Sequence, residues 1–314
     1  MAKHNITRAL FIVLALAFFI TTMVFTALAG PGLYPFLSST GNISADFSTQ
    51  ITPAGWAFSI WGIIYSFLAC SLVFILSGLF RKNAYGYIYC SPAVLPRAFF
   101  ITWCLNLGLN VSWLFLWDRR YMVPALVFLC LIASTNYKMI FLSCYGLQAY
   151  GPWLNKYHKV DLWLYRVLIQ NGIAIYATWT TIASLLNLTI VLTSNEGMSQ
   201  TDAATLSLSI LAVMVVVWFI LENSYFEKHV RFILSIYPVL IWSLTGVLTK
   251  NYNAAAPTRN DIFIAALLAV ACVLCASRVV LVIWRQMIQP IFKDVDPDDM
   301  VPMEIAERQK TIFK

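Results

Sequence analysis

Charged residues are scarce in this sequence. Asp, Glu, Lys and Arg make up 11% of its 314 residues, whereas a typical soluble domain holds about 25%. Hydrophobic residues make up 60%. This balance excludes a water-soluble fold and predicts a membrane protein. The formal net charge of +7 does not indicate nucleic-acid binding, because no basic patch with interleaved aromatic residues accompanies it.

Histidine and paired cysteine are also lacking. The three histidines, His4, His158 and His229, fall at predicted helix ends, which argues against a buried histidine-ligated haem or zinc site. The seven cysteines are scattered and predict no disulfide framework. Cys272 and Cys275 have the spacing of a metal or redox motif, yet no His or acidic residue accompanies them. We interpret them as small packing residues.

What the sequence has instead is long apolar runs. Backbone polar groups cannot remain unpaired in hydrocarbon, so such runs must form helices or a closed barrel, and uninterrupted runs favour helices. Each run is near or above the ~20 residues that cross a bilayer. The sequence therefore predicts an all-α membrane protein with about eight transmembrane helices. The runs span 9–30, 55–80, 98–117, 121–145, 163–193, 204–222, 231–249 and 261–284.

The basic residues orient these helices. With the amino terminus in the cytoplasm, most of the 21 Lys and Arg residues fall on the cytoplasmic side. Those in outer connections are Arg119, Arg120, Lys250 and Arg259. The positive-inside rule predicts this bias, so we expect both termini to be cytoplasmic.

Two basic residues and the first run need separate interpretation. Lys138 and Arg278 lie within predicted helices, each in the cytoplasmic half, and we expect both to snorkel toward the inner interface. The first run follows Lys3 and Arg8 and resembles a signal peptide. We expect it to be retained, because it is longer than the usual signal core of ~7–15 residues. Its cleavage would leave the other helices oriented as stated.

Three predicted helices place aromatic and amide side chains on one face, at three- and four-residue spacing. One interpretation is packing, with asparagines joining helices and tryptophans forming interfacial belts. The belt interpretation suits Trp117, Trp153, Trp163 and Trp242, near helix ends. The other is an aromatic-walled pocket, which would suit a flat apolar ligand. The three stripes are Phe58, Trp61 and Tyr65; Trp103, Asn106, Asn110, Trp113 and Trp117; and Tyr176, Trp179, Ala183 and Asn187.

These stripes resemble a known family. Tyr176-x-x-Trp179-x-x-x-Ala183-x-x-x-Asn187 resembles the fifth-helix signature of the TspO/MBR family, the translocator or tryptophan-rich sensory proteins. Asn110-x-x-Trp113 is similar to that family's third-helix pattern. The segment 53–65 resembles the loop and second helix of longer bacterial relatives, and 241–246 is similar to one of their late helices. The chain thus resembles a long form of the family.

The resemblance implies three parts and a ligand pocket. The parts are a TspO/MBR-like five-helix membrane domain over 1–200, three additional transmembrane helices over 201–285 and a cytoplasmic tail over 286–314. The pocket would take a flat apolar ligand such as a porphyrin or haem, and a sterol less readily, because 188–195 lacks the family's sterol-recognition pattern. The implied ligand-binding residues are Trp61, Tyr65, Asn110, Trp113, Tyr176, Trp179 and Asn187.

We therefore expect a membrane protein that binds such a ligand for sensing, sequestration or transport. A transporter or channel for another small molecule is the alternative. It is disfavoured because Asp161, Glu222 and Asp261 fall at predicted helix ends and outside the helix cores. An enzyme is not expected, since the sequence offers no acid–base pair, nucleophile–base pair or metal cluster.

The expected partners and modifications are few. They are the lipid bilayer, a small apolar ligand and, on small-residue helix faces, a second copy in a homodimer. Asn42-Ile-Ser44, in the outer connection, is a candidate glycosylation sequon, meaningful only in a eukaryotic secretory pathway. The acidic stretch 294–299 is expected to be a solvated part of the tail.

Overall fold

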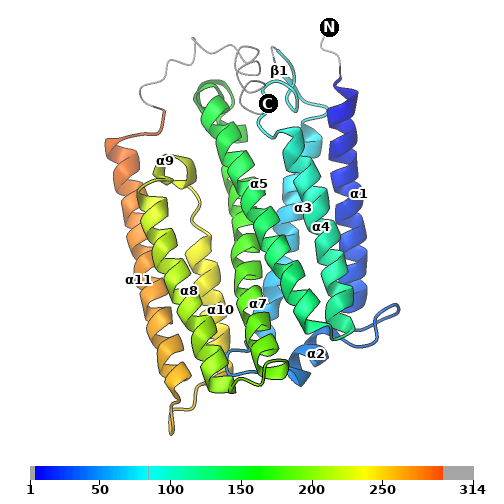
Figure 1. Ribbon diagram of the computed structural model, residues 1–314. Coiled ribbons are helices and arrows are strands. Elements are labelled where there is room, and N and C mark those ends of the chain that lie inside the picture. Colours follow the sequence, from blue (N-terminus) through cyan, green and yellow to red (C-terminus); the bar gives the residue numbers. More distant parts are fainter. Residues whose placement is uncertain (1–3, 84, 293–314) are drawn as a thin grey trace.

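The computed structural model describes residues 4–83 and 85–292 (Figure 1). Helices make up most of this range, and its strands form a short hairpin of β1 (Lys82–Asn83) and β2 (Gly86–Tyr87). The predicted all-α class is confirmed. The acidic stretch 294–299 and most of the predicted tail lie outside the described residues.

Seven of the described helical segments are long and apolar enough to cross a membrane, and each coincides with a predicted run. Two of these seven segments contain more than one element. One consists of the 3₁₀ helix η1 (Gly55–Ser59) followed by α3 (Ile60–Ser77). The other consists of α6 (Lys159–Leu164), the π-helix η2 (Tyr165–Asn171) and α7 (Gly172–Ser194). The others are α1 (Ile6–Ala29), α4 (Arg97–Asp118), α5 (Met122–Tyr157), α8 (Gln200–Asn223) and α11 (Arg259–Ile288).

The remaining predicted run, 231–249, forms a shorter helix. α10 (Ile236–Asn251) has 16 residues, which makes it about 24 Å long, less than the ~30 Å of a bilayer's hydrocarbon core. Residues 231–235 form a turn after the short helix α9 (Glu227–Val230). The Asn171 side-chain oxygen holds this turn by accepting from the backbone N–H groups of Leu234 and Ser235, at 2.9 and 3.2 Å.

Five helices close a ring in the order α1, α3, α7, α5 and α4, and α4 contacts α1 again. Helices α8, α10 and α11 pack on one another beside α7 (Figure 1). The segments cross the bundle in alternating directions, so α1 begins at the end where α11 finishes. The cytoplasmic identity of that end stays a prediction. The predicted boundary near residue 200 falls where α8 begins.

The outer surface of the bundle is apolar. Val73, Val213 and Val280 are among many large apolar side chains that are well exposed. Hydrocarbon solvates such a surface, whereas water would not. Together with the seven long helices, this surface makes the chain an integral, multi-pass membrane protein. Helix α2 (Thr40–Asp46) carries the exposed Asn42 at the end opposite the start of α1 (Figure 1).

Two of the three acidic residues at predicted helix ends stabilise those ends. Asp261 forms a capping box with Thr258: its carboxylate accepts from the Thr258 backbone N–H at 2.9 Å, and the Thr258 hydroxyl accepts from the Asp261 backbone N–H at 3.2 Å. Asp161, in the first turn of α6, pairs with Arg81 at 2.7 Å.

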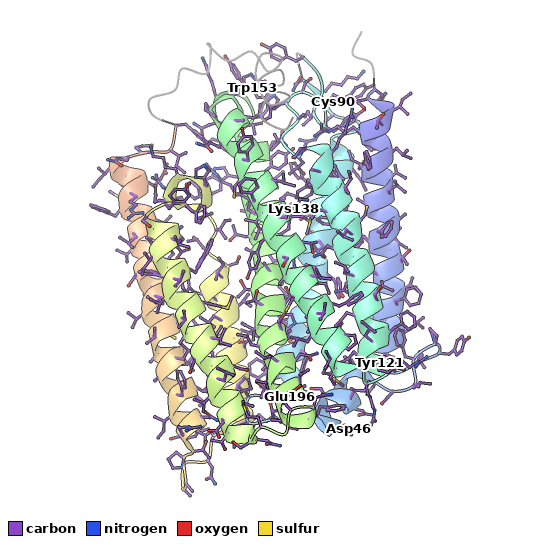
Figure 2. The ribbon with its side chains drawn as sticks, in the orientation of Figure 1. Asp46, Cys90, Tyr121, Lys138, Trp153 and Glu196 are labelled. Carbon is purple, nitrogen blue, oxygen red and sulfur yellow. The ribbon has the colours of Figure 1, made fainter. Side chains whose placement is uncertain are left out.

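The third, Glu222, lies beside Arg278 and corrects the prediction for that residue. It is 0% exposed and faces Arg278, which is 1% exposed and lies with its Nε 3.5 Å from the Glu222 carboxylate. The expectation that Arg278 snorkels is therefore wrong, whereas Glu222 lies at the end of α8 as predicted, although it is buried. The reason is that α8 and α9 both end here, so the Arg278 guanidinium finds free carbonyls inside, at Glu222 and Val230. Lys138, by contrast, is exposed on α5, in the half nearer the start of α1 (Figure 2).

Candidate functional site

The aromatic stripes of α3, α4 and α7 meet inside the five-helix ring. Trp61 lies at the centre of the cluster. Its ring stacks on Tyr65 and Trp113, with centroid distances of 5.7 and 6.2 Å and interplanar angles of 23° and 26°. It meets Tyr176 and Trp179 edge-on, at 5.9 and 6.5 Å. Both arrangements are favourable for aromatic pairs.

Asn110 holds the two tyrosines that flank Trp61. Its side-chain N–H donates to the Tyr176 hydroxyl at 2.6 Å, and its side-chain oxygen accepts from the Tyr65 hydroxyl at 3.4 Å. The Tyr65 hydroxyl also lies 3.1 Å from the Thr26 hydroxyl of α1. These hydrogen bonds link α1, α3, α4 and α7, so Asn110 has the helix-joining role that one interpretation gave to asparagines.

Several buried polar groups in this region have no hydrogen-bond partner among the described residues. They include the indole N–H groups of Trp113 and Trp179 and both polar atoms of the Asn187 amide. Leaving such a group unsatisfied typically costs about 1–3 kcal/mol. A site that receives an acceptor group from a ligand would recover this energy.

The structure brings six of the seven predicted ligand-binding residues together: Trp61, Tyr65, Asn110, Trp113, Tyr176 and Trp179. The seventh, Asn187, is buried on α7, eight residues beyond Trp179 and thus about 12 Å farther along the helix axis. The cluster therefore comprises aromatic rings and one amide, with Asn187 beyond its edge.

Sequence reasoning missed the contribution of α10. Trp242, interpreted as part of an interfacial belt, donates its indole N–H to the Ala57 carbonyl at 2.9 Å and meets the Trp56 ring edge-on at 4.9 Å. The Ala54 backbone N–H donates to the Gly246 carbonyl at 2.9 Å. Helix α10 thus holds η1 in place. Phe58, which belongs to η1, contacts the Trp179 ring. The similarity of 241–246 to a late family helix was the signal that pointed to this region.

Trp117 was also assigned to a belt, and it too belongs to the interior. It is buried, and its ring stacks on Trp113 at 5.7 Å. Among the described residues, no group of three or more His, Cys, Asp or Glu side chains could hold a metal ion. The cluster therefore offers stacking surfaces and hydrogen-bond donors rather than charged or metal-binding groups.

The fold and the cluster define the class of this protein: a multi-pass membrane protein whose five-helix ring surrounds a cluster of tryptophan, tyrosine and asparagine side chains. The comparison with family models is specific. The model described as TSPO-like protein matches residues 12–283, and the chain belongs to this family. The match runs from α1 into α11, so the last three helices are part of what the family shares. No curated protein and no solved structure matches the chain significantly.

Proposed function

We propose that this protein binds a flat apolar ligand of the tetrapyrrole class, such as a porphyrin or haem, at the aromatic cluster of α3, α4 and α7. The observation that carries the proposal is the position of Trp61, stacked between Tyr65 and Trp113 beside the unpartnered indole N–H of Trp179. The protein would sense, sequester or transport the bound ligand, and it would act by binding rather than by catalysis.

The chemistry of the cluster selects the ligand class. Stacked indole and phenol rings favour a ligand with a flat, extended π-system, because buried area and ring geometry both contribute to the free energy of binding. The unpartnered groups of Trp113 and Trp179 are donors, so they favour a ligand that carries acceptors, such as carboxylates. A sterol offers neither a flat π-system nor several acceptors, which makes it the weaker candidate. Trp61 and Phe58 are only half-buried, so a ligand would meet these two rings first.

Replacing Trp61 and Trp179 together by phenylalanine is expected to weaken protoporphyrin binding at least about tenfold, equivalent to about 1.4 kcal/mol. Phenylalanine keeps a ring in each position but removes stacking area and the indole N–H. Binding is measured by the quenching of intrinsic fluorescence, since the chain has 11 tryptophans and nine remain in the variant.

The matched control is Trp284→Phe. Trp284 lies on α11 and is 55% exposed, remote from the ring of five helices. This variant is expected to bind protoporphyrin like the parent. Unchanged affinity in the Trp61→Phe/Trp179→Phe protein would refute the assignment of the ligand to this cluster.

A second candidate function is ion-coupled transport. It is favoured by the buried Glu222, Tyr237 and Arg278 side chains among α8, α10 and α11, because ionisable groups inside a membrane protein often mark an ion or proton pathway. If this is the function, substrate flux into proteoliposomes should depend on a proton or sodium gradient, and Glu222→Gln should abolish that dependence. Flux that ignores both gradients would exclude it.

A further inference from the structure

A buried positive charge lies at the end of the bundle where α1 begins, far from the aromatic cluster. Arg8, in the first turn of α1, is only 9% exposed. One terminal N–H of its guanidinium donates to the Leu95 carbonyl, and its Nε is buried with no hydrogen-bond partner. Within residues 4–83 and 85–292, none of the ion pairs formed by carboxylates includes Arg8.

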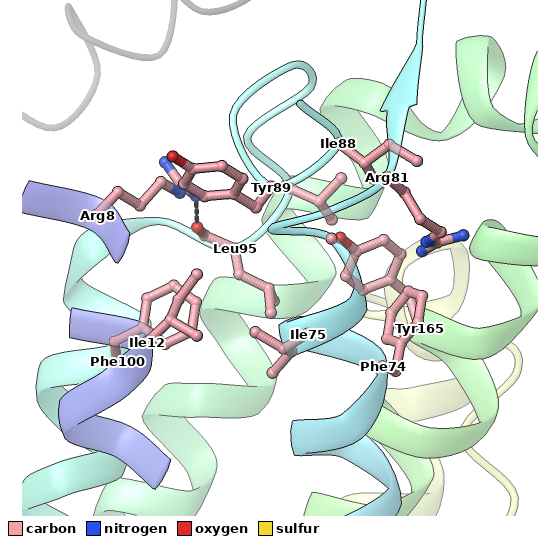
Figure 3. Close-up of a pocket in the computed structure, with 12 residues that line it drawn as sticks. Arg8, Ile12, Phe74, Ile75, Arg81, Ile88, Tyr89, Leu95, Phe100 and Tyr165 are labelled. Carbon is pink, nitrogen blue, oxygen red and sulfur yellow. Dashed lines mark hydrogen bonds between the residues drawn. The ribbon is translucent and has the colours of Figure 1, made fainter. Parts of the chain in front are cut away.

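Arg8 lines a small cavity of about 20 Å³. Figure 3 shows Arg8 and Leu95 on one side of it and Arg81 on the other, with Tyr165 reaching between them from η2. Ile12 and Ile75 contribute apolar walls. The cavity therefore lies where α1, the end of α3, η2 and the loop that precedes α4 meet.

The charges around this cavity do not balance. Arg8 and Arg81 contribute two positive charges, and Asp161, which pairs with Arg81 at 2.7 Å, contributes one negative charge. Among the residues that line the cavity and their ion-pair partners, one positive charge remains, and it belongs to the buried Arg8. A guanidinium keeps its proton in proteins, and a buried charge without a partner is strongly unfavourable.

Tyr89, one of two tyrosines that line the cavity, does not neutralise Arg8. Burial raises the pKa of Tyr89 to about 12, and hydrogen bonding to Cys90 adds to this effect. Tyr89 thus remains a neutral phenol at physiological pH. Its hydroxyl already accepts from the Asn5 backbone N–H at 2.9 Å. No carboxylate of the described residues pairs with Arg8, so its charge and its free Nε–H are available to an anion from outside.

We propose that this cavity binds a monovalent inorganic anion of the size of chloride, held by the free Nε–H of Arg8. One such anion would balance the single excess charge and occupy the unused donor. Space of this size holds about one water-sized particle, so phosphate, sulfate and lipid headgroups do not fit. A water molecule would fill the space but leave the charge unpaired. The bound anion would neutralise Arg8 where α1 packs against α3 and η2, so it would stabilise this end of the five-helix ring.

The test compares thermal unfolding of the full-length protein in detergent as sodium chloride replaces sodium gluconate at constant ionic strength. A ligand that binds only the folded state raises the unfolding temperature, and we expect chloride and bromide to raise it by about 2–4 °C over gluconate. Arg8→Gln should lose this response. Arg259→Gln, at an exposed arginine at the start of α11 and at the opposite end of the bundle, should retain it. Equal unfolding temperatures in chloride and gluconate would overturn the proposal, as would a full halide response in Arg8→Gln.

A second measurement keeps the test decisive if Arg8→Gln does not fold. Crystals of the unmodified protein grown in sodium bromide should give an anomalous peak between Arg8 and Tyr165. A peak there that disappears in gluconate and returns in bromide supports the anion. Ordinary water density at the same position in bromide would overturn it.

Discussion

Replacing Arg278 by methionine is expected to lower the free energy of unfolding by about 3–5 kcal/mol, the usual consequence of leaving a buried charge without its partner. The variant keeps much of the side-chain volume but loses the donors to Asn223 at 2.8 Å and to the Val230 carbonyl at 3.0 Å. It also removes the positive charge beside Glu222. Glu222 would keep its hydrogen bond from the Tyr237 hydroxyl but remain a buried carboxylate. Equilibrium unfolding in mixed detergent micelles, followed by tryptophan fluorescence, gives the difference.

A double variant separates the effect of charge from that of hydrogen bonding. The Glu222→Gln/Arg278→Met protein should recover part of the lost stability, because it no longer contains an unpaired charge. It should not recover all of it, since the Val230 carbonyl and the Asn223 side chain still lack their donor. The control is Arg259→Met. Its pair with Asp202 is exposed, and exposed pairs contribute little to stability. If the Arg278→Met protein is as stable as the Arg259→Met protein, the buried Glu222–Arg278 pair does not have the expected effect on stability.

The stripes on α3, α4 and α7 could be predicted because helical periodicity is a local property. Residues three and four apart share a face, so the spacing of Trp61 and Tyr65, or of Asn110 and Trp113, already places each pair on one side of its helix. Apolar length fixes the membrane-spanning character in the same local way. The meeting of the stripes around Trp61 then follows from ring closure, which pairs α3 with α7 and α5 with α4.

Contacts between distant segments could not be predicted in this way. Arg278 and Glu222 are 56 positions apart, and periodicity identifies a face without identifying what packs against it. The snorkelling interpretation considered only the depth of Arg278 in its helix. It failed because the end of α8 supplies buried acceptors at that depth. Trp242 was misassigned for the same reason, since only the fold places η1 beside it.

The contact between α10 and η1 predicts a second large effect, at Gly246. A Cβ atom at this position would lie 2.7 Å from the Ala57 Cβ and 3.4 Å from the Pro53 Cβ. Neither neighbour is the end of a flexible side chain, so Gly246→Ala must push α10 away from η1. We expect a loss of about 1–3 kcal/mol in the free energy of unfolding, as for other overpacked sites. The displacement also strains the Ala54–Gly246 and Trp242–Ala57 hydrogen bonds, and because η1 carries Phe58 against Trp179, protoporphyrin affinity should fall severalfold.

Gly62→Ala is the matched control for this effect. Gly62 also lies inside a helix, but nothing lies within 4 Å of an added Cβ there. Alanine is the better helix former by about 0.5–1 kcal/mol, so this variant should be slightly more stable than the parent. The two substitutions add the same methyl group, and the difference between them measures the contact of α10 with η1. If Gly246→Ala matches Gly62→Ala in both unfolding and protoporphyrin titrations, the carboxyl-terminal helices do not support the aromatic cluster.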